Sequence, residues 1–144
     1  MHKKLQSSFS TRQYMLSKDY ELYYYHDTSI NTVELHTHDY YEFYFFLGGN
    51  VSLQIDKDIH QVSPGDMVIL PPGLSHKPII HDVSEPYRRF VFWISSEFCN
   101  HLLNLSADYG YLMQLVATRK TYVFHNNNIT FNSIISRLLR LLEE

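Results

Sequence analysis

The sequence predicts a mainly β domain, a small β-barrel or sandwich, that is followed by α-helices. Before Ser95, short segments rich in β-branched and aromatic residues alternate with turns that contain glycine or proline. After Ser95, the apolar residues recur at helical spacing instead. The chain has 144 residues, of which 44% are hydrophobic and 15% aromatic, so it is long enough to form one domain with a real core.

Composition and charge exclude several classes of protein. With 12 basic and 15 acidic residues the formal net charge is −3, so the sequence lacks the excess of basic residues that is typical of nucleic-acid-binding domains. Cys99 is the single cysteine, so an internal disulfide framework is excluded. No apolar run approaches the length of a membrane span, and the N-terminal lysines are not followed by the apolar stretch of a secretory signal. We therefore expect a cytoplasmic protein without a membrane partner.

The segments that favour strands are short and are separated by turn signals. Val51, Leu53 and Ile55 alternate with polar residues, as in a half-exposed strand. We expect strands over residues 21–26, 32–38, 40–47, 51–55, 59–62, 67–70, 76–81 and 88–94. We expect turns at residues 48–50, 56–58, 63–66, 71–73 and 84–86.

The C-terminal third favours helices. Ser95 or Ser96 can cap a helix that ends near Leu105, and residues 107–117 favour a second helix. Residues 121–124 favour a last short strand.

A final helix is predicted from Asn132 or Ser133 to the end of the chain. Its polar side carries Arg137 and Arg140. Its apolar side comprises Ile134, Ile135, Leu138, Leu139, Leu141 and Leu142. Because this helix reaches residues 143–144 without a C-cap, we expect either a helix that leads into another domain or one that packs on the barrel. Both interpretations allow it to pair with a second copy.

The stretch HTHDYYE, residues 36–42, contains two histidines and a glutamate and lies in the most aromatic part of the chain. In a strand, alternate residues share a face, so His36, His38 and Glu42 lie on the same side. That side continues with aromatic residues and is predicted to face the barrel interior. The other side is also apolar from Tyr41 onward, so we expect helices or another sheet to cover it.

Two imidazoles and a carboxylate on one face suit Zn, Ni, Mn or Fe. A further ligand is available at His76, directly after the stiff loop of residues 71–73. Two alternatives stay open. These groups can instead bind a small ligand directly, or they can satisfy one another through hydrogen bonds in the mouth of the barrel.

The segment HTHDYYEFYFFLGG, residues 36–49, resembles the first motif of the cupin superfamily, and GDMVILPPGLSH, residues 65–76, resembles the second. The resemblance implies a small β-barrel with a metal site inside it. In metal-binding cupins the positions that hold the metal match His36, His38, Glu42 and His76. The sequence departs from the motifs at Ile30, where a glycine is usual, and at Ile80, where an asparagine is usual.

Residues 36–78, together with PYRRFVFWISSEF at residues 86–98, are similar to the effector-binding domain of AraC/XylS-type transcription regulators. The resemblance covers nearly all of residues 20–144. It implies a polar N-terminal arm, a cupin-like barrel and a helical segment for dimerisation and linkage, here residues 1–18, 19–95 and 96–144. It also implies that DNA is bound only through a separate C-terminal helix-turn-helix domain, which this chain lacks.

Further candidates for the walls of a ligand pocket come from two strands. Tyr44 and Phe46 continue the interior face of HTHDYYE, and Trp93 shares a strand face with Arg89 and Val91. An indole beside a guanidinium suits a polar ring or an acidic ligand. The alternative is that the aromatic side chains are plain core and that Arg89 pairs with an acid.

These observations lead us to expect the effector-sensing and dimerisation domain of an AraC-type regulator rather than an enzyme. Its ligand is a small molecule, commonly a sugar in this family, and its cofactor, where one is used, is a divalent metal. The rival interpretation is a small metal-dependent cupin enzyme, a dioxygenase or an isomerase. A stand-alone binding or storage module is a third.

Overall fold

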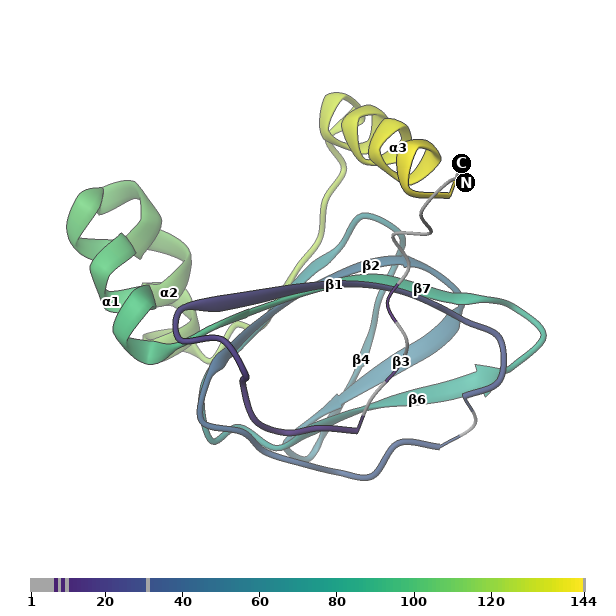
Figure 1. Ribbon diagram of the computed structural model, residues 1–144, viewed down its shortest axis with the longest axis horizontal. Coiled ribbons are helices and arrows are strands. Elements are labelled where there is room, and N and C mark those ends of the chain that lie inside the picture. The colour runs from purple at the N-terminus through teal and green to yellow at the C-terminus, as the bar shows by residue number, and fades with distance from the viewer. Residues whose placement is uncertain (1–6, 8, 10, 31, 144) are drawn as a thin grey trace.

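The computed structural model describes Ser7, Phe9 and residues 11–30 and 32–143. This part of the chain forms eight strands and three helices (Figure 1). The result confirms the predicted mainly β fold with C-terminal helices. Part of the predicted arm, residues 1–6, 8 and 10, lies outside the described residues.

The strands form two antiparallel sheets that face each other (Figure 1). The larger sheet has the order β1-β7-β2-β5-β8 and the smaller one the order β4-β3-β6. The strands of the larger sheet are β1 (Tyr20–Asp27), β7 (Tyr87–Ile94), β2 (Tyr41–Gly48), β5 (Met67–Leu70) and β8 (Val123–Phe124). Those of the smaller sheet are β4 (Asp58–Gln61), β3 (Asn50–Ile55) and β6 (His76–Asp82).

The core lies between the inner faces of the two sheets. On β2, Tyr44 and Phe46 are buried, and Leu53 on β3 and Val68 on β5 meet them in one cluster. Tyr40, just before β2, is 1% exposed. Residues 42, 44 and 46, which the sequence predicts for the interior, lie on one side of β2, because alternate residues of a strand share a side.

The predicted strand over residues 32–38 is wrong. In the described residues of this segment only an isolated bridge forms, in which the amides and carbonyls of His36 and His76 bond at 3.2 and 3.0 Å. In this antiparallel register the next hydrogen-bonded pair would join Glu34 to Pro78. Because proline has no N–H to donate, the ladder cannot continue there.

The prediction that the polar residues of β3 are exposed is wrong at Ser52. Its side chain is 0% exposed because neighbours from both flanking strands cover it. The hydroxyl donates to Gln61 at 3.0 Å, and His81 Nε2 lies 2.8 Å away. This polar contact joins all three strands of the smaller sheet on its outer face.

Helices α1 (Ser96–Leu105) and α2 (Ala107–Arg119) lie together at one end of the barrel (Figure 1). The predicted cap is present, since the Ser95 hydroxyl accepts a hydrogen bond from the Phe98 amide at 3.1 Å. Cys99 is the buried residue of α1. Among the described residues, no helix is both long and apolar enough to cross a membrane.

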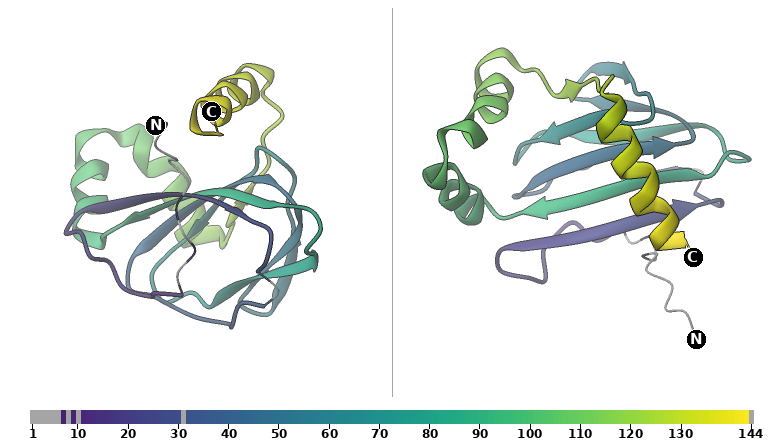
Figure 2. Two further views of the ribbon diagram at one scale, coloured as in Figure 1. Left: turned by 45° about the vertical axis from the view of Figure 1, so that its right-hand side comes forward. Right: turned by 90° about the horizontal axis from the view of Figure 1, so that it is seen from above.

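Helix α3 (Ile129–Glu143) crosses the outer face of the larger sheet (Figure 2). Ile135 packs there against the cluster of Tyr24, Leu47 and Phe90, so a helix covers this face as predicted. The helix begins before Asn132, where the sequence predicted its cap. The Asn132 side chain instead accepts a hydrogen bond from the Asn126 amide group at 3.2 Å.

Asp66 attaches the segment before α3 to the barrel. It is 2% exposed, and its carboxylate accepts from the amides of Ser63 at 2.8 Å and Asn126 at 3.2 Å. His125 Nδ1 also lies 2.8 Å from this carboxylate. The backbone amide of Phe46 donates to the Asp66 carbonyl at 3.0 Å. The turn that carries Asp66 therefore connects β2, a strand of the cavity wall, to the start of α3.

Replacement of Asp66 by alanine is expected to lower the free energy of unfolding by about 2–4 kcal/mol, because buried donors lose a charged acceptor. Urea denaturation measures this change. The matched control is Asp58→Ala, at an exposed position of β4. Equal losses in the two variants would show that Asp66 does not hold the fold in this way.

Candidate functional site

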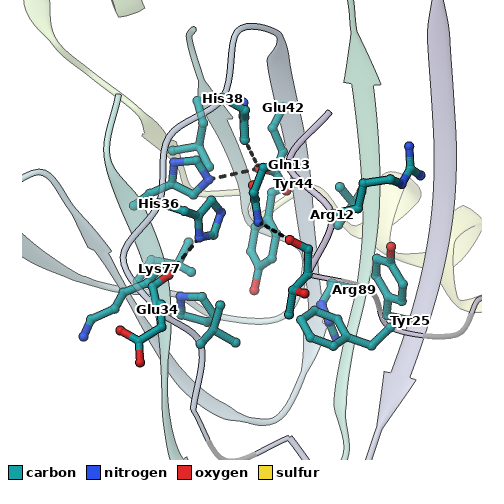
Figure 3. A pocket seen from close by; sticks show the side chains of 18 of the residues that line it. Arg12, Gln13, Tyr25, Glu34, His36, His38, Glu42, Tyr44, Lys77 and Arg89 are labelled. Atoms are coloured by element: carbon teal, nitrogen blue, oxygen red, sulfur yellow. Dashed lines mark hydrogen bonds and ion pairs between the residues drawn. The ribbon is translucent and has the colours of Figure 1, made fainter. Parts of the chain in front are cut away.

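A cavity of about 450 Å³ lies between the two sheets. Both sheets contribute to its wall, as do the arm at residues 11–13 and the loop at residues 32–34. Its volume falls in the usual range for small-molecule sites. Figure 3 shows polar side chains gathered around it.

One end of the cavity carries His36, His38 and His76, and their candidate ligand atoms lie within 4.8 Å of one another. Each ring Nδ1 lies 2.8–3.0 Å from the backbone carbonyl of the residue two positions away. A carbonyl only accepts, so each Nδ1 must carry the hydrogen. In the neutral rings the lone pair is then on Nε2.

Glu42 lies between two of these rings. Its Oε2 is 3.0 Å from Nε2 of His38 and 3.2 Å from Nε2 of His76. Burial alone would raise the pKa of Glu42, but the two histidines outweigh it and hold that pKa well below its ordinary value. For His76, burial lowers the pKa, and the Glu42 carboxylate more than compensates, so the pKa is raised.

This donor set fits a divalent metal. Backbone contacts fix all three imidazoles in the tautomer that offers Nε2, as ligating histidines require. The carboxylate of Glu42 lies beside two of those nitrogens. The ligand set predicted from the sequence, His36, His38, Glu42 and His76, is therefore brought together in space.

The opposite end of the cavity is built around Arg89 on β7. Its Nη1 donates to Asp27 at 2.6 Å and to the Tyr87 carbonyl at 3.2 Å. Its guanidinium carbon lies 4.0 Å from the ring centre of Tyr87 and 4.5 Å from that of Tyr25. The hydroxyls of Tyr87 and Tyr44 lie 2.7 Å apart. Arg89 thus pairs with an acid and also lines the cavity.

The predicted pocket residues separate into two groups. Tyr44, Arg89 and Trp93 line the cavity, whereas Phe46 is 1% exposed and belongs to the core. Phe46 lies farther along β2, where its ring packs 6.4 Å from that of Tyr87. Tyr87 lines the cavity, whereas Phe46 does not.

Trp93 is covered by other side chains. The guanidinium of Arg12 lies 5.2 Å from its ring, and the rings of Tyr40 and Tyr23 lie at 4.7 and 5.2 Å. Its Nε1 is buried and has no hydrogen-bond partner among the described residues. The indole thus positions the arm over the cavity.

Several lining residues were missed by the sequence analysis. Tyr87 could have been found, because it extends by one step the alternation of Arg89, Val91 and Trp93 along β7. Phe9 and residues 11–13 had no such signal, since the arm has no periodic pattern.

Glu21 anchors the arm. Its side chain accepts from Arg12 at 3.1 Å and from the Leu16 amide at 2.9 Å, and the Tyr23 hydroxyl also donates to it. Burial alone would raise the pKa of Glu21, but the hydrogen bonds from Tyr23 and Arg12 outweigh it and the pKa is lowered. Because the pKa is lowered in the folded state, the stabilisation by this contact is complete above the ordinary pKa of glutamate. It is lost as the pH falls through the lowered pKa.

Glu21→Gln is expected to release the arm. Hydrogen exchange over residues 11–16 should become about tenfold faster at neutral pH, because the charged acceptor for Arg12 is lost. At pH values below the lowered pKa of Glu21, the wild-type arm should show the same protection factors as the variant shows at neutral pH. Glu85→Gln, at an exposed turn, is the control. Unchanged exchange in Glu21→Gln would contradict this account of the arm.

Solved structures similar to this chain include a cupin 2 conserved barrel domain protein from Salinispora arenicola, 18% identical, with a TM-score of 0.49 over 69% of this chain and 80% of that one. A cupin protein from Bacteroides fragilis is 16% identical, with a TM-score of 0.47 over 66% and 87%. The DMSP lyase DddQ from Ruegeria pomeroyi is 24% identical, with a TM-score of 0.46 over 56% and 40%.

A search of curated proteins finds no match. The family model described as the AraC-like ligand binding domain matches residues 18–144. The match covers both sheets and the three helices. The chain therefore belongs to the family of AraC-like ligand binding domains.

Proposed function

We propose that this chain senses a small-molecule effector for an AraC-type transcription regulator. The observation that carries the proposal is the cavity, which is enclosed by both sheets, has polar groups at two ends and is bordered by the chain's own arm. DNA binding then belongs to a separate C-terminal domain. Such a regulator works in the cytoplasm, and a single buried cysteine accords with a reducing compartment.

The fold offers two routes by which a ligand can change the regulator. The arm at residues 11–13 lines the cavity, so a ligand touches it directly. β2 carries Glu42 and Tyr44 of the cavity wall and is joined through Asp66 to the segment before α3. Coupling requires that the ligand bind one arrangement of the arm or of α3 more tightly than another.

Helix α3 supports a homodimer. While Ile135 packs on the sheet, Ile134, Leu138 and Leu141 are 58%, 40% and 70% exposed. Spacings of three and four residues place these side chains on one stripe, as in helices that pair. The side chains of Leu139 and Leu142 lie outside the described part of the chain.

The sensing proposal is tested by a thermal-shift screen of small molecules, followed by two measurements on the compound that stabilises the chain most. Sedimentation equilibrium gives the dimer affinity, and hydrogen exchange gives the protection of residues 11–16. We expect at least one of these quantities to change about fivefold or more with bound ligand. Equal dimer affinity and equal arm protection in the bound and free forms would contradict the mechanism.

A divalent metal is proposed as a cofactor of the same cavity. His36, His38, His76 and Glu42 would hold it, and the ion would act as a Lewis acid that anchors an oxygen of the ligand. The chain itself fixes the three rings through their Nδ1 atoms, and the ring of Tyr40 stacks on that of His38 at 4.0 Å.

Metal content provides the test. After metal-supplemented purification, the wild-type chain should retain about one ion, and the double variant His38→Ala/His76→Ala should retain none, because two of the donors are gone. Elemental analysis by mass spectrometry measures this. The double variant His60→Ala/His101→Ala, away from the cavity, should keep the wild-type content. A wild-type chain free of metal would refute the cofactor.

The rival function is a metal-dependent cupin enzyme, a dioxygenase or an isomerase. The specific observation in its favour is the three-histidine, one-carboxylate set, which leaves room for a substrate to coordinate. The reading frame beyond Glu144 discriminates between the two. Continuation into paired helix-turn-helix units favours the regulator, and a stop codon favours the enzyme.

A further inference from the structure

Arg89 is a buried cation that uses only part of its hydrogen-bonding capacity. Its side chain is 4% exposed, and both of its hydrogen bonds to described residues come from Nη1. Among the described residues, no partner meets Nε or Nη2. In the described part of the chain, the fully buried side-chain atoms without a hydrogen-bond partner are Tyr40 Oη and Trp93 Nε1. Nε and Nη2 of Arg89 are not among them, so neither atom is completely enclosed by protein. Arg89 is one of the residues that line the cavity, so a ligand there can reach this side chain.

The free edge of the guanidinium has the geometry of a carboxylate receptor. Nε and Nη2 lie side by side in a rigid plane and can donate two parallel hydrogen bonds to two oxygens. The rings of Tyr87, Tyr25 and Phe9, at 4.0, 4.5 and 5.6 Å, hold this plane in place. Asp27 contacts only Nη1, so the existing ion pair leaves the fork open.

The two sheets supply apolar side chains to the wall between Arg89 and the histidines, namely Leu53 and Ile55 from β3, Leu70 from β5 and Val91 from β7. The polar lining residues Thr11 and Gln13 belong to the arm. A polyhydroxylated ring in this space would place hydroxyls against groups that cannot pair with them, at a cost of about 1–3 kcal/mol for each. A hydrocarbon body would fill the same space favourably.

We propose that the effector is a small organic acid, with its carboxylate on Nε and Nη2 of Arg89 and its apolar body between Leu53 and Val91. The inference rests on the proposed function, because it names the ligand class of the same cavity. Lys77 is a second cation in the cavity lining, but its ammonium lacks the planar fork of a guanidinium, so we assign the carboxylate to Arg89 alone. The acid is selected by the guanidinium fork and by the apolar side chains that the two sheets place along the wall.

The experiment compares acids with neutral analogues of the same shape on the whole chain. Isothermal titration calorimetry is run with benzoate against benzamide, with hexanoate against hexanamide, and with arabinose as a sugar probe. Each acid should bind about tenfold to a hundredfold more tightly than its amide, which is the range for a hydrogen-bonded charge pair. Arabinose should bind more weakly than either acid.

Variants locate the preference. Arg89→Gln should reduce the affinity for each acid to that for its amide and leave the amide affinity unchanged within about threefold. Arg89→Gln alone leaves the carboxylate of Asp27 buried without a cation, which can destabilise the fold. The double variant Asp27→Asn/Arg89→Gln removes both charges, and the same loss of acid preference is expected in it. Lys77→Gln is the matched control and should keep the preference for acids.

Four results would overturn the acid class: equal affinities for acid and amide, no binding of either acid, tighter binding of arabinose, or a preference that follows Lys77 instead of Arg89. The sensing proposal is judged separately. It stands if any screened compound changes the dimer affinity or the arm protection, and it falls if none does. The two proposals can thus fail independently.

Discussion

The pairing of charges buried inside a small β-barrel is the constraint on which the rest of this structure depends. An ion removed from water must be neutralised or hydrogen-bonded, so each buried charge fixes the position of another part of the chain. Glu42 fixes two histidines, Arg89 fixes Asp27, and Glu21 fixes the arm through Arg12. Asp66 does the same for the segment that leads to α3. The interior, the arm and the C-terminal helix are therefore held by polar contacts in addition to the aromatic core.

This arrangement gives the cavity a polar group at each end, and the two sheets place apolar side chains between them. The histidine end has its imidazoles fixed by backbone carbonyls and its carboxylate held ionised. The other end has a guanidinium oriented by aromatic rings, with one edge free. Because the arm borders this space and β2 continues toward Asp66, a guest in the cavity contacts the elements that a regulator would need to move.

Much of the fold could be predicted from the sequence, because alternation and turn residues are local signals. The ligand set at His36, His38, Glu42 and His76 followed from motif spacing, and the structure brings these side chains together. The failures have physical reasons. Residues 32–38 lose their ladder to the missing N–H of a proline on the neighbouring strand, which depends on a register that no single segment encodes. The arm's place in the cavity wall rests on contacts between residues distant in sequence, and the division of the chain at residues 18 and 95 stays a prediction.

The most direct measurement is a crystal structure of the chain with the compound that stabilises it most in the thermal-shift screen. The account predicts that this compound lies between Arg89 and the histidines, beneath residues 11–13, with a polar group on at least one end of the cavity. A compound bound on the outer surface, with the interior closed by side chains, would contradict the claim that this barrel is built to hold a guest.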